Sequence, residues 1–478
     1  MNGKEIVIKA LDDYQERMYQ ASDEIWEHPE IAFQEYHSME LLCDMLTEAG
    51  FQVEKNLVNI PTAFKAVYGS GKPVIAFLGE YDALDGLSQI SGLAEKKEKP
   101  GEKLGHGCGH HTIAVGALGA AVAVKKYLEK NRKTGTIVFY GCPGEEGGSG
   151  KAFMVRDGAF ENVDAALTWH PGDQTGLFTG RCLANIGVTY HFKGVSAHAG
   201  GLAYIGRSAL DAVELMDVGA NYLREHVVPE ARIHYAITDT GGTSPNVVQS
   251  HASVFYYLRA PEPYYVREMY ERMGNIAKGA AMMTGTEVEI EYNRGVNSLM
   301  PNDCLNHVMH ENMETIGLPE YTKKDHETAV KFRETIEEKD ITFQELLSSM
   351  TKKEKPLVME HRGKDIYDFI IPELSTEPLL LGSTDVGDVS MTCPVAQLHA
   401  ATYAAGTALH SWQAVAQGKE PLMHKGELYA AKVLACTAVD LFENPKLVEQ
   451  AKEELQERLG EHPFESLMPK DVKPKLKR

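Results

Sequence analysis

The sequence lacks any long hydrophobic run. None of its segments reaches the roughly twenty apolar residues that a membrane-spanning helix needs. Its start, MNGKEIVIKALDDYQERMYQ, also lacks the basic beginning and unbroken apolar stretch of a secretory signal, and carries acids in an amphipathic helical pattern instead. We therefore expect neither a membrane span nor a secretory signal.

Basic residues are scarce relative to acidic ones. The chain holds 48 lysines and arginines against 68 aspartates and glutamates, which gives a formal net charge of −20. A surplus of negative charge repels phosphate backbones and anionic lipid headgroups. Nucleic acid and membrane are therefore not expected as partners.

Cysteine is sparse and shows no paired pattern. The seven cysteines are an odd number, lie scattered between Cys43 and Cys436, and include no Cys-x-x-Cys pair. In a chain of this size, such a pattern indicates a reducing compartment rather than a disulfide framework. We expect a cytoplasmic protein, and a thiol-redox function built on Cys108 is the least favoured hypothesis.

The length of 478 residues favours two domains, because one hydrophobic core seldom organises so long a chain. Helical periodicity covers 3–26 and 36–49, and short β-branched and aromatic runs follow at 73–79, 136–141 and 165–170. A strong helical pattern, HTIAVGALGAAVAVKKYLEKN, separates the first two runs. Apolar strands separated by helices predict an α/β domain whose mainly parallel sheet is covered on both faces.

A different pattern occupies residues 184–297. An alternating strand opens it, and the expected elements follow in the order strand, helix, strand, strand, helix, strand. This order predicts a ferredoxin-like α+β domain, inserted into an α/β domain formed by residues 1–183 and 298–478. In the second part of the α/β domain, the charged stretch 318–365 predicts a helical surface insertion. A long helix at 426–443 and a charged tail are expected to end the chain.

The stretch GHGCGHH at 105–111 is a poor packing element, because glycine costs backbone entropy and imidazole gains little from burial. Cys108 and His110 are separated by one residue on this flexible loop, so both can face one point. A thiolate and an imidazole together favour zinc or a similar transition metal over magnesium or calcium. Taken alone, the motif could also be a surface loop with an inert thiol.

Two adjacent carboxylates follow the run at 136–141. Glu145 and Glu146 in CPGEEGG would repel each other if both were desolvated without a cation, so a solvated turn is the simpler interpretation of the pair alone. Beside a metal, one carboxylate can bind the ion while the other accepts the proton of a water molecule, as in a hydrolase. His170 after LTW and His410 in GTALHSW are ambiguous when each is taken alone.

The order of six motifs resembles the M20 family of metal-dependent amidohydrolases and peptidases, in particular its branch with a cysteine ligand. The motifs are GEYDAL, GHGCGHH, GCPGEEGGSGK, LTWHPG, KGVSAHAGG and GTALHSWQ. The resemblance extends along nearly the whole chain. It implies a two-metal catalytic domain interrupted by a dimerisation or lid domain. It also implies two divalent ions per chain, zinc or manganese, and a homodimer, which a related A-type subunit could join.

The resemblance assigns roles to individual residues. The implied metal ligands are Cys108, His110, Glu146, His170 and His410, with the Cys108 thiolate bridging the two ions. Glu145 is implied as the general base. Asp82 is implied as a carboxylate that orients a ligand, a support that such sites normally need. His198 in SAHAGG is implied as a donor to the oxyanion in the partner subunit's active site.

The implied reaction is hydrolysis of the amide bond of a small acyl- or aroyl-amino acid, with p-aminobenzoyl-glutamate the leading candidate. Asn246 and Arg259 are candidates for holding the substrate carboxylate, because amide and guanidinium donors suit it; Arg259 could equally form an ordinary ion pair on a strand. A dipeptidase or aminoacylase of the same family is the first alternative. A metal-binding protein without catalysis is the alternative from another class, disfavoured because Glu145 is present.

Two positions depart from the family pattern. Glu80 in GEYD stands where many M20 enzymes carry a metal-binding histidine, so the ligand set has to follow the cysteine branch. His111 stands where similar proteins carry asparagine or aspartate, and it could orient a ligand or compete as one. The division of the five ligands between two ions does not follow from the sequence.

Overall fold

The apolar runs predicted as strands form the centre of a seven-stranded sheet in the computed structural model, which describes residues 2–476. The strand order is β1-β2-β6-β3-β7-β15-β8; β6, β3, β7 and β15 are parallel, and the remaining neighbours pair antiparallel. This mainly parallel sheet confirms the predicted α/β class. Its strands are β1 (Gln52–Lys55), β2 (Phe64–Ser70), β3 (Val74–Glu80), β6 (Gly135–Cys142), β7 (Ala165–Gly172), β8 (Gly176–Leu177) and β15 (Val395–Ala401).

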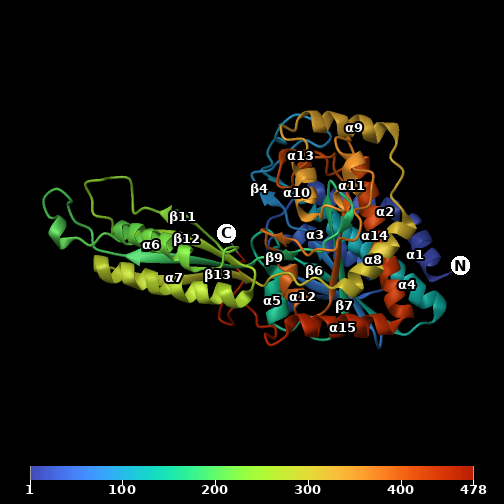
Figure 1. Ribbon diagram of the computed structural model, residues 1–478, viewed down its shortest axis with the longest axis horizontal. Helices are drawn as coiled ribbons and strands as arrows, with labels where there is room; N and C mark the ends of the chain where they lie inside the picture. The colour runs from blue at the N-terminus through green and yellow to red at the C-terminus, as the bar shows by residue number, and fades with distance from the viewer. Residues whose placement is uncertain (1, 477–478) are drawn as a thin grey trace.

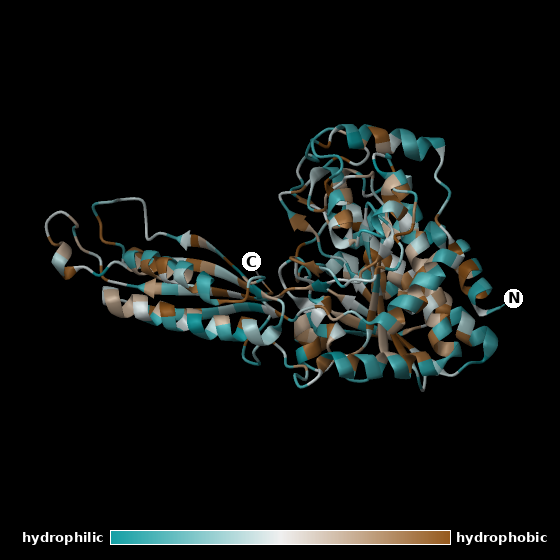
Figure 2. Ribbon diagram, viewed as in Figure 1, coloured by the Kyte–Doolittle hydropathy of each residue, from teal (hydrophilic) through white to brown (hydrophobic). Residues whose placement is uncertain are grey.

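The two faces of this sheet contribute to two separate cores, because successive side chains of a strand point to opposite faces. Ile75 and Phe77 of β3 enter one core, whereas Ala76 and Leu78 enter the other. Figure 2 shows the central strands as mostly hydrophobic, while the outer helices carry hydrophilic residues as well. The first core is covered by α1 (Gly3–Asp12), α2 (Gln15–Glu27), α3 (Tyr36–Glu48), α4 (His110–Asn131), α8 (Asp303–Ile316) and α14 (Pro421–Glu443); α5 (Gly150–Arg156) and α12 (Val386–Ser390) cover the second.

The helices differ from the sequence analysis in two places. The helix expected over 3–26 is broken after Asp12, and the break allows α1 and α2 each to pack against α4. The expected charged tail contains another helix, α15 (Pro445–Leu459). Its buried residues Val448, Ala451 and Leu455 form a narrow apolar stripe among charged residues, which is the pattern of a helix with one buried face.

The charged stretch 318–365 is helical, as predicted. It forms α9 (Lys323–Glu334), α10 (Ile341–Ser349) and α11 (Lys355–Val358), with α13 (Trp412–Ala416) nearby in Figure 1. This region has a small hydrophobic cluster of its own, which includes Phe343, Tyr367 and Phe369. Two short strand pairs complete this lobe: β4 (Leu84–Asp85) with β5 (Leu104–Gly105), and β9 (Arg181–Cys182) with β14 (Leu379–Leu380).

A second lobe projects from the first (Figure 1). Its antiparallel sheet has the order β11-β12-β10-β13. The elements follow the predicted strand and helix order: β10 (Ala184–Lys193), α6 (Ala209–Leu223), β11 (Arg232–Asp239), β12 (His251–Ala260), α7 (Pro263–Thr284) and β13 (Glu287–Val296). The two helices and the sheet share a hydrophobic core, so this lobe is the inserted α+β unit that the sequence predicts.

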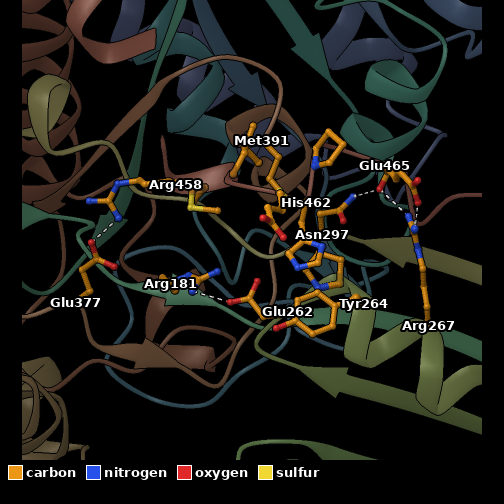
Figure 3. Close-up of a pocket in the computed structure, with 15 residues that line it drawn as sticks. Arg181, Glu262, Tyr264, Arg267, Asn297, Glu377, Met391, Arg458, His462 and Glu465 are labelled. Atoms are coloured by element: carbon orange, nitrogen blue, oxygen red, sulfur yellow. Dashed lines mark hydrogen bonds and ion pairs between the residues drawn. The ribbon is translucent and has the colours of Figure 1, made fainter. Parts of the chain in front are cut away.

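The segment after α15 joins the two lobes. Leu467 is buried in the core of the second lobe, whereas the next residue, Met468, is buried in the core of the first. A cavity of about 450 Å³ lies at this junction (Figure 3). Three arginines line it, and each is paired with a glutamate: Arg181 with Glu262, Arg267 with Glu465, and Arg458 with Glu377. None of the predicted site residues lines this cavity.

Among the described residues, no helix combines the length and the apolar character needed to cross a membrane.

Candidate active site

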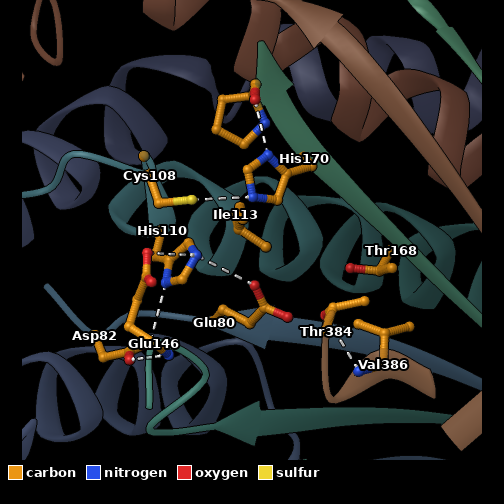
Figure 4. A network of polar contacts seen from close by, with 12 residues as sticks. Glu80, Asp82, Cys108, His110, Ile113, Glu146, Thr168, His170, Thr384 and Val386 are labelled. Atoms are coloured by element: carbon orange, nitrogen blue, oxygen red, sulfur yellow. Dashed lines mark hydrogen bonds and ion pairs between the residues drawn. The ribbon is translucent and has the colours of Figure 1, made fainter. Parts of the chain in front are cut away.

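The predicted site residues of the first lobe meet at the carboxyl end of its central sheet. His110 is the first residue of α4, and Cys108 lies in the loop just before it. Glu146 lies in the loop after β6, and His170 lies on β7 near its end. His410 comes from the loop after β15. Figure 4 shows Cys108, His110, Glu146 and His170 turned toward one another. Parallel strands place their following loops at one edge, and this arrangement gathers donors that are distant in the sequence.

The donor atoms form overlapping groups. One group is Cys108, His110 and His170, and another is Cys108, Glu146 and His410; within each, the ligand atoms lie within 4.8 Å of one another. Glu145 joins His110 and Glu146 in a third group. The structure therefore brings together all five predicted ligands and the predicted base, with Cys108 common to the first two groups.

Hydrogen bonds orient the two imidazoles of the first group. His110 Nδ1 lies 3.0 Å from Asp82 Oδ1, and His170 Nδ1 lies 2.8 Å from the carbonyl oxygen of Pro171. Asp82 Oδ2 accepts a further bond of 2.9 Å from the backbone N–H of Glu146. Both imidazoles thus direct Nε2 into the site, with His170 Nε2 3.4 Å from Cys108 Sγ. Asp82 holds one imidazole and the backbone of a carboxylate donor at once.

Two backbone positions explain the local sequence. Gly109 ends the loop before α4 with φ of 74°, and a Cβ there would lie 2.5 Å from Pro171 Cγ and 2.7 Å from Tyr403 Oη. Only glycine therefore lets the start of α4 approach the end of β7 so closely. His410 also has a positive φ, 58°, which is uncommon for a residue with a side chain and is found at functional sites.

Burial and neighbouring charges perturb the acids of the site. Burial raises the pKa of Glu145 to about 8, and the charges of Glu80 and Asp385 add to this effect. Burial acts in the same direction on Glu146, but the imidazoles of His410 and His110 outweigh it and lower its pKa to about 2. Burial and the charge of Glu146 raise the pKa of the Cys108 thiol. A cation would be needed to hold that sulfur as a thiolate.

The site has the chemistry of a transition-metal centre. His110 Nε2 is buried and makes no hydrogen bond with any described residue, and buried Glu146 Oε1 has an ion-pair contact of 3.1 Å with His410 Nε2. Buried polar atoms without hydrogen bonds are costly, so such atoms in a native structure point to a missing ligand. Thiol, imidazole and carboxylate donors at these spacings fit zinc and similar ions.

Sequence reasoning missed a buried charge cluster next to the donors. Lys151 is fully buried and forms ion pairs with Asp385 and, at 2.7 Å, with Glu80 Oε1. Glu80 Oε2 lies 3.6 Å from His110 Nε2, yet Glu80 belongs to none of the donor groups. The ammonium of Lys151 thus holds a carboxylate at the position where many M20 enzymes carry a histidine. The only hint of Asp385 in the sequence is the pair of acidic residues in STDVGD.

His111 lies outside the donor groups. Its Nε2 is 2.8 Å from the carbonyl oxygen of Gly418, and its ring packs against His106 with centroids 4.9 Å apart. Burial lowers the pKa of His111 to about 4, so the ring is neutral near pH 7. Its contacts join α4 to the segment that precedes α14.

His198 and Asn246 lie together, but in the second lobe. His198 forms an isolated bridge with Val247, and the N–H of Ala199 donates to the carbonyl of Asn246. The segment that carries them lies at the end of this lobe farthest from the central sheet (Figure 1). His198 Nδ1 accepts bonds from the N–H groups of Gly200 and Gly201, so the neutral ring carries its proton on Nε2 and is a donor there.

Arg259 lies at the other end of the second lobe. It stands near the end of β12, and its Nη1 donates to the carbonyl of Leu381 in the first lobe at 3.2 Å. Between His251, where β12 begins, and Arg259 the strand spans ~26 Å at about 3.3 Å per residue. Within one chain, the structure therefore does not bring Asn246 and Arg259 together.

The chain belongs to Peptidase family M20/M25/M40, whose model matches residues 76–469. It is 46% identical over 468 residues to the B subunit of p-aminobenzoyl-glutamate hydrolase from Escherichia coli, covering 97% of each chain. It is 26% identical to human Xaa-Arg dipeptidase, covering 95% of this chain and 92% of the relative. A dinuclear metal-binding M20 peptidase from Bacillus subtilis has the same fold, with a TM-score of 0.58 at 17% identity, covering 90% of this chain and 99% of that chain.

Proposed function

We propose that this chain is a metal-dependent amidohydrolase that cleaves p-aminobenzoyl-glutamate into p-aminobenzoate and glutamate. The observation that carries the proposal is the pair of donor groups around Cys108 with Glu145 beside them. The relative from Escherichia coli, similar over 97% of both chains, supports the substrate. Because that relative is the B subunit of a hydrolase, it also supports a related A-type subunit as a partner of this chain.

The donor groups indicate how two divalent ions, zinc or manganese, would divide the ligands. His110 and His170 would hold one ion, Glu146 and His410 the other, and Cys108 would contribute to both. A similar fold described as dinuclear supports the number of ions. When bound, the metal pair would supply Lewis-acid polarisation and make water a stronger acid. Asp82 would keep His110 in the orientation that binding requires.

The roles of the chain's own acids follow from their positions. Glu145 lies beside the donors but is not needed to complete either group around Cys108, so it is free to exchange a proton. It would take a proton from the attacking water and return it to the leaving amine. Lys151 would offset part of the negative charge that Glu80, Asp385 and Glu145 place together.

The position of His198 supports a homodimer. The segment that carries His198 lies at the end of the second lobe farthest from the central sheet (Figure 1), so we infer that its Nε2–H group serves an oxyanion in another protomer. β11 is an edge strand of the second lobe and exposes Tyr235 and Ile237, while the neighbouring α6 exposes Tyr222. An unpaired edge with exposed apolar side chains suits pairing with a second copy. The domains would be 1–183 with 298–478 for catalysis and 184–297 for dimerisation.

In such a dimer, one substrate carboxylate could meet donors from two chains. Asn246 would come from the partner together with His198, and Arg259 would come from the chain that supplies the metal donors. This division explains how residues at opposite ends of one lobe could serve one ligand. The amide of Asn246 and the guanidinium of Arg259 can both donate hydrogen bonds to a carboxylate.

Hydrolysis of p-aminobenzoyl-glutamate by the purified protein loaded with zinc or manganese tests the proposal. We expect release of p-aminobenzoate, and we expect amidation of the substrate α-carboxylate to lower kcat/KM strongly, because the donors lose a charged partner. Chromatographic product quantification measures both substrates under identical conditions. Equal turnover of the amidated compound would remove carboxylate recognition from the proposal. Faster cleavage of dipeptides than of p-aminobenzoyl-glutamate would favour the dipeptidase alternative.

A further inference from the structure

A second group of metal-binding side chains lies outside the active site. Four groups of histidine, cysteine and carboxylate side chains bring ligand atoms within 4.8 Å in the described part of the chain, and three of them belong to the candidate active site. The fourth consists of Glu24, His28 and His37, where α2 ends and α3 begins. We propose that this group, the α2–α3 site, binds one additional transition-metal ion such as Zn²⁺.

The spacing of the donor atoms suits such an ion. Glu24 Oε1 lies 3.4 Å from His28 Nδ1 and 3.2 Å from His37 Nε2. Zinc binds imidazole nitrogen and carboxylate oxygen at about 2.0–2.2 Å, and tetrahedral geometry then separates neighbouring donors by about 3.3–3.6 Å. Both distances from the carboxylate are therefore close to tetrahedral spacing, and the two imidazole nitrogens lie within 4.8 Å of each other. All three side chains are about half exposed, so the ion can enter from solvent and keep water as a further ligand.

The chemistry of the group favours zinc over magnesium or calcium, because two of its three donors are imidazoles. Without a metal, His28 can carry a proton on the nitrogen that would bind the ion. His28 Nδ1 lies 3.0 Å from the carbonyl oxygen of Glu24, where a protonated ring would donate and cap the end of α2. An ion bound at this nitrogen would replace that proton, and the neutral ring would then carry its proton on Nε2.

The α2–α3 site is connected to the active site through the turn between the two helices. The carbonyl of Glu30 accepts a bond of 2.7 Å from Ala83, the neighbour of Asp82. Glu35 Oε1 accepts a bond of 2.9 Å from Gly144, the neighbour of Glu145. An ion held by Glu24, His28 and His37 would link both ends of this turn. Its binding should therefore stabilise the folded chain and the support beneath two active-site loops.

Calorimetric titration with Zn²⁺ tests the proposal on protein already loaded with its active-site metals and freed of excess ion. We expect the wild type to bind one more equivalent and to gain thermal stability. His28→Ala and His37→Ala should each weaken this binding by more than the roughly 10- to 100-fold typical of losing an outer-shell partner. Both variants should keep the active-site metals. His307→Ala is the matched control, because His307 is exposed beside two carboxylates, Glu311 and Glu373, but belongs to none of the four groups.

Anomalous diffraction at the zinc edge locates the ion directly in crystals of the loaded wild type soaked with Zn²⁺. A peak between Glu24, His28 and His37 supports the site. Two results overturn it: no additional equivalent in the wild type, or unchanged binding in both histidine variants. An additional equivalent that His307→Ala removes would place the ion elsewhere on the surface.

Discussion

Replacing Glu145 by glutamine should leave the metal content unchanged while lowering kcat by about two to four orders of magnitude, the usual contribution of a positioned acid–base group. The amide of glutamine fills the same space but cannot take a proton from water. Glu145 lies beside His110 and Glu146 without being required by either donor group around Cys108, so its loss should spare metal binding. Elemental analysis and steady-state kinetics on the same sample measure both quantities.

Glu146→Gln is the matched control, since it makes the same chemical change at the next residue. Glu146 belongs to the donor group of Cys108 and His410, so this variant should bind less metal. Its activity should be partly restored by excess metal, whereas that of Glu145→Gln should not. If the two phenotypes are exchanged, the roles of base and ligand have been assigned the wrong way round.

Mixed dimers should recover activity that their parents lack. Chains with Glu145→Ala and chains with His198→Ala should both be nearly inactive as homodimers. In a mixed dimer, the His198→Ala chain keeps its own Glu145 and receives His198 from its partner. One site per dimer is then complete, and activity should reach about half that of the wild type.

Two different affinity tags on the coexpressed chains allow the mixed dimer to be purified and its composition verified. Asn246→Ala in place of His198→Ala provides a second test, because Asn246 lies beside His198 and should complement Glu145→Ala in the same way. Verified mixed dimers as inactive as their parents would mean that His198 acts within its own chain or has no role in catalysis.

The positions of Glu146 and His170 were predictable because each follows a recognisable apolar run, whereas Cys108, His110 and His410 were assigned by the resemblance of their motifs to a family. Parallel strands place those ends at one edge, so His170 on β7 and the loop after β6 had to meet. Sequence could not divide the ligands between two ions, because that depends on distances between loops. In the structure, Cys108 shares one donor group with His110 and His170 and another with Glu146 and His410, while a third group also joins His110 to Glu146.

Other features depend on tertiary contacts that leave no local signal. Asp385 pairs with Lys151 across 234 positions of sequence, and neither residue lies in a periodic pattern. The sequence places Asn246 and Arg259 in one inserted unit, but only the length of β12 shows that they lie at opposite ends. The charge of the final segment concealed α15, because a narrow apolar stripe is enough to bury one face of a helix.

The measurement that tests the central claim most directly is the number of metal ions per chain in Cys108→Ala. Cys108 belongs to both of the donor groups that the account assigns to the two ions. The account therefore predicts about two ions per chain in the wild type, and a loss of metal and activity in the variant. Cys43→Ala, which removes another buried thiol from α3, should keep both ions. A Cys108→Ala protein with full metal occupancy and full activity would contradict the account.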